Sequence, residues 1–351
     1  MSENRKFKIA YIELDTHADI LSNFYGLLHD SEIFSVSYFI SDKISRQFQV
    51  QDSAIRVVNP SNVLQILQNE NWDLVIIGTA HRYFNLFSDI VTTFPTALIA
   101  HNLAFTSISK INLVKSLFKE DFFYRLKLLF TEGLLSVHSV FKNAKVIFVL
   151  DEKLGNKQRQ FLPVFYVHKT EKSTSEYFTV VVPGAVSQKR RDYKRILNQV
   201  SHFGQPTQMI LLGKAQGEEL RWIEEAKKRV PKNVQLKYFT EKVSQDEYDA
   251  RLRSADVLWC PIQIDTEYFS NDEKYGKTKV SGNIGDAIKF ATPAVFPKYY
   301  ENNYPFIFSE ISDIEKQLHS VSNTTIDWSL FARNTVKERL ENALLKAINS
   351  Y

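Results

Sequence analysis

The chain has 351 residues, enough for two domains of ordinary size. Hydrophobic residues make up 44% and charged residues 24%, which is the balance of a globular protein and not of a disordered chain. A net charge of +4 is too small to indicate a nucleic-acid-binding protein, and the single cysteine, Cys260, excludes a disulfide framework or a cysteine metal cluster.

The chain starts with the polar segment MSENRKFK, which lacks the apolar core of a signal peptide. No uncharged apolar run is long enough to span a membrane. We therefore expect a cytoplasmic protein, with at most a loose contact at the inner face of the membrane. Cys260 ends the apolar run ADVLWCPI, and we interpret it as a packing residue at a strand end.

Strands and helices alternate through the first half of the chain. Apolar runs predict strands at 8–14, 34–40, 55–58, 73–78, 96–100 and 145–150. Helical spacing predicts helices at 19–30, with Asp19 as the cap, at 59–70, with Pro60 in its first turn, and at 86–94. This alternation is typical of a parallel sheet with helices on both faces.

The alternation restarts after a polar segment at 168–176, which we interpret as a linker. Strands are predicted at 178–184, 208–213, 234–239, 256–262 and 293–297, and helices at 192–203, 217–230 and 244–255. We therefore expect an α/β protein with two Rossmann-like domains, residues 1–170 and 171–330. A last helix at 331–351 could pack back on the first domain. Ligands of such sheets bind at the carboxyl ends of the strands, so the cleft between the domains is the expected site.

The segment YGKTKVSGNIGDAIKFATPAV, residues 275–295, predicts a loop, a helix and a buried strand. The start of a helix offers unpaired N–H groups and a partial positive charge, which suit a phosphate. Lys277 and Lys279 add cations there, and Asp286, about one turn inside, could accept hydrogen bonds from a ribose. These parts suit a nucleoside diphosphate; a basic surface loop before an ordinary core helix is the alternative.

Three segments together resemble a GT-B glycosyltransferase, most closely the family 4 type that uses nucleotide sugars. TVVVPGAVSQKRRDYKRIL at 179–197 is similar to the first strand and glycine turn of that family's nucleotide domain. MILLGKAQGEEL at 209–220 is similar to its next strand and helix, and residues 275–295 are similar to its acidic helix region. The resemblance covers residues 179–297, whereas the first half matches only in the rhythm of its elements.

The resemblance implies a first domain that binds the acceptor and a second that binds a UDP- or GDP-sugar, with retention at the anomeric carbon. The family has two glutamates eight positions apart, where this chain has Thr278 and Asp286. No Asp-x-Asp motif occurs, so we expect cations rather than a metal to stabilise the leaving diphosphate. The expected phosphate contacts are Lys189, Arg190, Arg191, Lys277, Lys279, Ser281 and Gly282, with Asp286 at the ribose. A solvated basic turn is the alternative for the three consecutive basic residues.

Candidate acceptor residues follow strands of the first domain. Asp15 and His17 come after the strand at 8–14, where His17 could take a proton from an acceptor hydroxyl. Asp15 could equally cap a helix. His101 follows the strand at 96–100, and the resemblance implies that it contacts the donor sugar. His81 is a weaker candidate for the same cleft.

An insert at 107–142 mixes Phe and Leu with six basic residues. Such a basic amphipathic segment could lie on an anionic membrane, which would suit a lipid-linked acceptor. It could equally be a pair of helices whose apolar stripe packs on the domain. The basic residues are Lys110, Lys115, Lys119, Arg125, Lys127 and Lys142.

The sequence thus predicts a glycosyltransferase that acts on a saccharide or lipid-linked saccharide in surface polysaccharide or glycolipid assembly. Two alternatives remain: a nucleotide-sugar 2-epimerase, and a non-catalytic subunit that binds a nucleotide sugar within a transferase complex.

Overall fold

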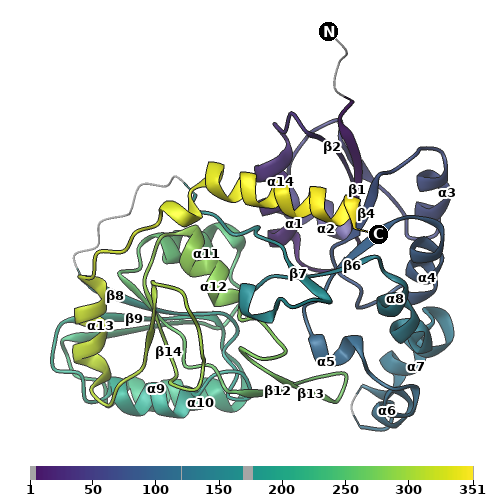
Figure 1. Cartoon of the computed structure of the whole chain (residues 1–351). Coiled ribbons are helices and arrows are strands. Elements are labelled where there is room, and N and C mark those ends of the chain that lie inside the picture. The colour runs from purple at the N-terminus through teal and green to yellow at the C-terminus, as the bar shows by residue number, and fades with distance from the viewer. Residues whose placement is uncertain (1–4, 120, 169–176, 351) are drawn as a thin grey trace.

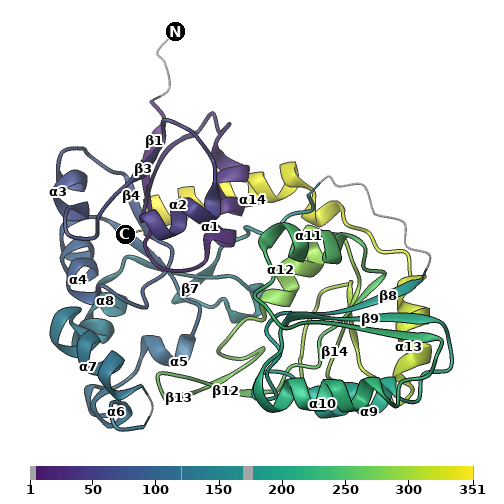
Figure 2. The same ribbon diagram turned by 180° about the vertical axis from the view of Figure 1, so that it is seen from behind.

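The computed structural model describes residues 5–119, 121–168 and 177–350. Two parallel sheets lie within these ranges, one from each half of the chain, and helices cover both faces of each sheet (Figures 1 and 2). The predicted fold class, α/β with two Rossmann-like domains, is confirmed. Of the predicted linker at 168–176, all but His168 lies outside the described residues.

The first sheet has seven strands in the order β3-β2-β1-β4-β5-β6-β7, all parallel to their neighbours. Alternate residues of β1 enter opposite cores: Ile9 and Tyr11 face one, Ala10 and Ile12 the other. A sheet buried on both faces explains the continuous apolar runs of these strands. The strands are β1 (Phe7–Glu13), β2 (Phe34–Ile40), β3 (Ile55–Val57), β4 (Leu74–Ile77), β5 (Thr96–Ile99), β6 (Val146–Val149) and β7 (Arg159–Phe161).

Two sets of helices cover this sheet. One face holds α1 (Ala18–Leu28), α2 (Asp42–Phe48) and α14 (Arg333–Asn349). The other holds α3 (Val63–Gln68), α4 (Phe84–Thr93) and α8 (Val137–Asn143). The last helix, α14, therefore lies on the first domain, although it follows the second in sequence (Figure 2). It buries Val336, Leu340, Leu344 and Ala347 in the core of the first domain, at the spacing of one helix face.

The second sheet repeats the winding of the first, in the order β10-β9-β8-β11-β14-β15. Helices α9 (Tyr193–Val200), α10 (Gly217–Lys227) and α13 (Ile314–Ser322) cover one face. Helices α11 (Gln245–Arg253) and α12 (Gly282–Lys289) cover the other. The strands are β8 (Phe178–Pro183), β9 (Thr207–Lys214), β10 (Val234–Phe239), β11 (Val257–Trp259), β14 (Ala294–Phe296) and β15 (Ile307–Ser309). Cys260 is fully buried in this core, as predicted.

The insert forms α6 (Lys110–Ser116), α7 (Phe122–Thr131) and the start of α8, after the short α5 (Leu103–Thr106). Leu113 and Leu128 enter the core of the first domain together with residues of α8, so an apolar stripe does pack on the domain. Three single turns complete the elements: η1 (Leu134–Ser136), η2 (Glu152–Leu154) and η3 (Ser329–Phe331).

Some local structure differs from the sequence-based expectation. Asp19 does not cap α1: His17 occupies the cap position with φ 61°, and its carbonyl accepts from the N–H groups of Ile20 and Leu21. Asp19 lies instead in the first turn, where a carboxylate favours the helix dipole. The elements that were not predicted include the strands β12 (Asp265–Tyr268) and β13 (Asn271–Lys274), which form an antiparallel hairpin of polar sequence.

Candidate active site between the two domains

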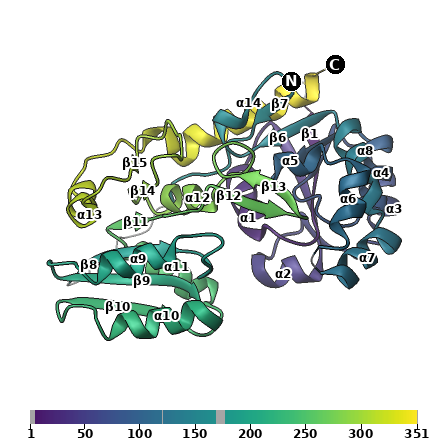
Figure 3. The ribbon, with the colours of Figure 1, turned by 90° about the horizontal axis from the view of Figure 1, so that it is seen from below.

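Loops from the carboxyl ends of both sheets meet at a junction between the domains. We define the junction as residues 14–17, 78–82 and 100–102 of the first domain and 184–191 and 275–282 of the second. Leu103 N donates to Thr278 O at 2.8 Å, and Asn102 and Lys279 form an isolated antiparallel bridge. The hairpin β12–β13 reaches across beside them (Figure 3). Ligand sites of parallel sheets lie at this end of the strands.

Three histidines of the first domain gather at the junction. The rings of His17 and His101 stack with centroids 3.8 Å apart and planes 6° from parallel. His81 meets both at an edge, 5.7 Å from His101 and 6.1 Å from His17. His101 Nε2 lies 2.8 Å from Gly78 O, so this nitrogen carries the proton and Nδ1 keeps its lone pair. The sequence named all three histidines but gave no sign that two would stack.

Burial keeps these imidazoles neutral. Burial lowers the pKa of His17 to about 3, and it also lowers the pKa values of His81 and His101. The positive charge of Lys279, from the second domain, adds to the lowering of all three pKa values. At physiological pH the cluster therefore offers uncharged nitrogens that can accept or donate hydrogen bonds, next to a cation.

A buried carboxyl holds the loop that leads to His17. Glu13 ends β1 with no exposed surface and lies 2.8 Å from Thr79 Oγ1. It accepts from the N–H groups of Asp15 and Thr16 at 3.4 and 3.3 Å. Burial raises its pKa to about 8. A Cβ at Gly78 would come within 2.5 Å of this carboxyl, so glycine permits the close approach of the two strand ends.

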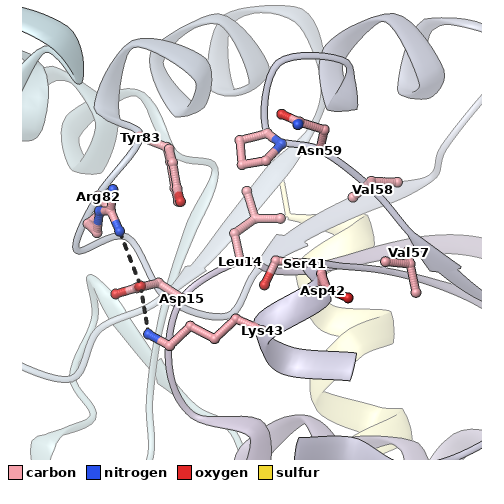
Figure 4. Close-up of a pocket in the computed structure, with 11 residues that line it drawn as sticks. Leu14, Asp15, Ser41, Asp42, Lys43, Val57, Val58, Asn59, Arg82 and Tyr83 are labelled. Carbon is pink, nitrogen blue, oxygen red and sulfur yellow. Dashed lines mark hydrogen bonds and ion pairs between the residues drawn. The ribbon is translucent and has the colours of Figure 1, made fainter. Parts of the chain in front are cut away.

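Asp15 faces a cavity of about 430 Å³ in the first domain (Figure 4). Its carboxylate lies 3.0 Å from Lys43 Nζ and 3.5 Å from Arg82 Nη1. Arg82 also pairs with the buried Glu132, which fixes the guanidinium. The other lining residues are Leu14, Ser41, Asp42, Val57, Val58, Asn59, Pro60 and Tyr83. Carboxylate, guanidinium and phenol side chains around an apolar floor suit a polar ligand with many hydroxyls.

The start of α12 forms the opposite side of the junction. Ser281 caps the helix, its Oγ accepting from Asn283 N at 3.3 Å. Arg191 is buried and donates to Asn283 Oδ1 at 2.9 Å. The guanidinium lies against Gly184, which has φ 98° and where a Cβ would come within 2.6 Å of it. Arg191 therefore ties the loop after β8 to α12, a positioning role that the sequence did not predict.

Asp286, a residue of α12, accepts two hydrogen bonds. Asn283 Nδ2 donates at 3.0 Å and the Tyr248 hydroxyl at 3.1 Å. Burial raises the pKa of Asp286 to about 6, although both hydrogen bonds favour the carboxylate. Neither Tyr248 nor Asn283 was named from the sequence, because each belongs to the site through contacts that only the folded chain makes.

The remaining predicted phosphate contacts differ in exposure. Lys279 is half-buried, and burial and the charge of Arg190 lower its pKa, so the two cations lie near each other. Lys189, Arg190, Lys277 and Gly282 are exposed. A Cβ at Gly282 would meet no atom within 4 Å, which leaves the helix start open.

The hairpin β12–β13 supplies groups that the sequence analysis missed. Glu273 is fully buried and accepts from Phe105 N at 3.0 Å and Ala104 N at 3.3 Å, at the start of α5. Tyr268 packs with its ring 4.7 Å from His81. A second-domain element thus contacts the first domain beside the histidines. A polar ten-residue stretch carries no periodicity that would reveal this.

Among the described residues, no three His, Cys, Asp or Glu side chains are grouped so as to hold a metal ion. Within the same ranges, no helix combines the length and apolar character that crossing a membrane requires.

No family model matches the sequence of the chain, and no curated protein matches it either. Solved structures match over the whole chain. The glycosyltransferase AviGT4, involved in avilamycin A biosynthesis, gives a TM-score of 0.56 at 11% identity, covering 98% of this chain and 99% of that one. Anabaena HepE in complex with UDP and glucose gives 0.56 at 10% identity, covering 97% and 100%.

The UDP-GlcNAc 2-epimerase of Methanocaldococcus jannaschii gives a TM-score of 0.52 at 11% identity, covering 97% of this chain and 99% of that one. Identities this low establish the fold alone. Two Rossmann-like domains in this arrangement make the GT-B fold, and the chain has it.

Proposed function

We propose that the chain is a glycosyltransferase that moves a sugar from a UDP- or GDP-sugar to a saccharide or lipid-linked saccharide acceptor, in the assembly of a surface polysaccharide or glycolipid. One observation carries the proposal: three imidazoles of the first domain lie close enough to Lys279 for its charge to lower their pKa values, and Lys279 lies three residues before the start of α12. Sugar transfer requires both a group for the acceptor proton and a positive site for the leaving diphosphate.

The donor diphosphate is proposed to bind at the start of α12. The N–H groups of Asn283 and Ile284 already bond to Ser281, so the phosphate is proposed to meet the exposed Gly282 and the partial positive charge of the helix start, together with the cations of Lys279 and Arg190. Exposed Lys189 and Lys277 would add charge at the rim, and Arg191 would hold the two loops in register. Asp286 is proposed to accept from the ribose. The cations stabilise the departing charge, so we propose activity without added metal.

The acceptor is proposed to occupy the cavity beside Asp15, with a hydroxyl near His17. The low pKa of His17 leaves one ring nitrogen without a proton at neutral pH, so it can accept a hydrogen bond from that hydroxyl. Because a pKa of about 3 makes the imidazole a weak base, we propose that it takes the proton only as the acceptor oxygen attacks the anomeric carbon. The acceptor oxygen forms a bond to the anomeric carbon, and the bond from that carbon to the diphosphate breaks with the electron pair leaving on the diphosphate. His101 is proposed to contact the donor sugar. Family resemblance favours retention, whereas proton transfer to His17 from the opposite face would give inversion; NMR of the product's anomeric proton distinguishes them.

The test is an assay of UDP- and GDP-sugars with a panel of saccharide acceptors, with and without EDTA, followed by mass spectrometry. A product enlarged by one sugar, with EDTA present, supports the proposal. Conversion of a donor to its epimer without acceptor would support the 2-epimerase alternative. That alternative is retained because the fold is also similar to that of a UDP-GlcNAc 2-epimerase. Donor binding by calorimetry with no conversion across the panel would instead indicate a non-catalytic subunit.

A further inference from the structure

The insert leaves large apolar side chains in water. Phe118, Phe123 and Phe130 are 76%, 84% and 76% exposed, and Ile111 and Phe122 are exposed as well. Exposed apolar residues are ordinary when scattered, whereas a contiguous group marks an interaction surface. We call these five residues, together with the exposed Lys110, Lys115, Lys119 and Lys127, the insert surface.

The apolar members are contiguous. The rings of Phe118 and Phe122 lie 5.9 Å apart and those of Phe122 and Phe123 5.5 Å apart, joining the end of α6 to the start of α7. On α7, Phe123 and Phe130 are seven residues apart and share a face, whereas Ile111 lies on α6 and Phe118 in the turn that follows it. The inward stripe through Leu113 and Leu128 is separate from these residues, because it is already buried in the core.

Lysines surround these rings. Lys110, Lys115, Lys119 and Lys127 are exposed, and the one exposed acid among the described residues of α6, α7 and the turn between them is Asp121. The remaining basic residue, Arg125, is buried and donates to Ser116 O and Ser270 Oγ. Exposed aromatic rings with a surplus of lysine match an anionic lipid surface, where rings enter the interface and ammonium groups meet the headgroups.

The insert surface adjoins the candidate acceptor cavity. Tyr124, at the start of α7, is close enough to Arg82 and Asp15 for their charges to affect its pKa, which burial raises. Both residues line the cavity. Tyr124 directly follows Phe123 of the insert surface, so a bilayer in contact with these rings would lie near the candidate acceptor cavity.

We propose that the insert surface docks the chain on an anionic lipid bilayer. Docking itself is independent of catalysis; its consequence, that the acceptor is carried by a lipid, rests on the proposed function. The free energy comes from the aromatic rings and from the lysines together, so loss of either set should release the chain.

The test is flotation of the full chain with phosphatidylcholine vesicles that do or do not contain phosphatidylglycerol. We expect partition to the anionic vesicles and little to the neutral ones. The triple variant Lys115→Gln/Lys119→Gln/Lys127→Gln should lower anionic partition at least about tenfold. The triple variant Phe118→Ser/Phe123→Ser/Phe130→Ser should lower it at least about tenfold as well.

Matched controls come from the second domain. Lys214→Gln/Lys232→Gln/Lys237→Gln removes three exposed lysines, and Ile311→Ser/Leu330→Ser removes two exposed apolar residues. Both should float as the unchanged chain does. No binding to anionic vesicles, or equal loss in test and control variants, overturns the proposal.

Analytical ultracentrifugation tests whether the insert surface binds a second copy of the chain instead of a bilayer. A dimer that the phenylalanine variant dissociates, in a chain that does not float, would assign the surface to self-association and overturn the proposal. Calorimetry of donor binding on the same proteins separates the two hypotheses. Vesicle binding without donor binding would refute the proposed function and leave docking intact, and the reverse result would refute docking alone.

Discussion

After β1 the chain places a buried carboxyl, Glu13, and a neutral imidazole, His17. After β8, at the equivalent strand of a sheet with the same winding, it places Gly184 and the buried guanidinium of Arg191. Burial affects the two loops differently. It raises the pKa of the carboxyl and lowers that of the imidazole, so both lose charge near neutral pH. A guanidinium keeps its proton in any protein environment.

Two sheets with the same strand order thus present different kinds of surface to the junction between the domains. The first domain offers uncharged acceptors and donors suited to hydroxyl groups, and the second offers fixed positive charge suited to an anion. If this division holds, substitutions in the first domain should change turnover and those in the second should change nucleotide affinity.

The largest effect should come from His17→Ala. Loss of a general base lowers a rate by about 10²-fold or more. Because the imidazole lies on the first domain, the affinity for UDP should stay within about twofold. Steady-state kinetics and calorimetry of the same protein measure both quantities. His202→Ala, an exposed histidine of the second domain, is the control. A parallel loss of turnover and affinity would show that the two sides are not separate.

Lys279→Ala and Arg190→Ala should lower the affinity for the nucleotide. A charge-assisted contact to phosphate is worth about 1.5–3 kcal/mol, so each change should weaken UDP binding about tenfold or more. Lys232→Ala, an exposed lysine that precedes β10 at the opposite end of the sheet, should leave binding unchanged. Unchanged affinity in both test variants, combined with a requirement for manganese, would remove the proposed phosphate site.

Much of this division between uncharged groups on the first domain and cations on the second can be predicted from the sequence, because apolar runs show where the strands end. Apolar runs located β1 and β5, which placed His17 and His101 at one edge of the first sheet. Likewise Lys279 and Asp286 follow from the loop and helix of residues 275–295. Such features depend on local periodicity and on the rule that ligands bind at the carboxyl ends of parallel strands.

Contacts between distant segments could not be predicted. Arg191, which the sequence analysis predicted as a phosphate contact, donates to Asn283, ninety-two positions later, and no local pattern indicated that hydrogen bond. The hairpin that places Glu273 at the start of α5 has a polar sequence, and its burial depends on the other domain. Burial also sets the pKa values, and Glu13 at the end of a strand gives no local sign that it is enclosed.

An effect on stability rather than on activity should follow from Glu13→Gln. The folded-state pKa of about 8 lies above the usual 4.5, so the protonated form is favoured on folding. The resulting stability is fully present below pH 4.5 and is lost as the pH rises toward 8. Glutamine keeps the hydrogen bonds to the loop and cannot ionise. The variant should therefore gain on the order of 3 kcal/mol over the unchanged chain at pH 7.

Denaturant unfolding at pH 4.5, 7 and 8.5 measures this gain, which should be near zero at the lowest pH. Asp246→Asn, an exposed acid for which no such change is expected, is the control. A difference that stays constant over the whole range would mean that Glu13 ionises in the folded protein as it does in water.

The smallest effect concerns Asp286 and the pH dependence of donor affinity. Its pKa of about 6 means that the carboxylate acquires a proton as the pH falls from 7.5 to 5. A carboxylate accepts a ribose hydroxyl more strongly than the neutral acid does, so affinity should weaken by a few fold over this interval.

The ligand should be a UDP-sugar rather than UDP, because the terminal phosphate of UDP itself titrates there. Asp286→Asn should bind more weakly at pH 7.5 and lose the pH dependence, since asparagine does not titrate. Calorimetry at both pH values compares the two proteins, with Asp246→Asn expected to follow the unchanged chain. Equal slopes in all three would place the ribose elsewhere on the second domain and leave Asp286 as a partner of Tyr248 and Asn283.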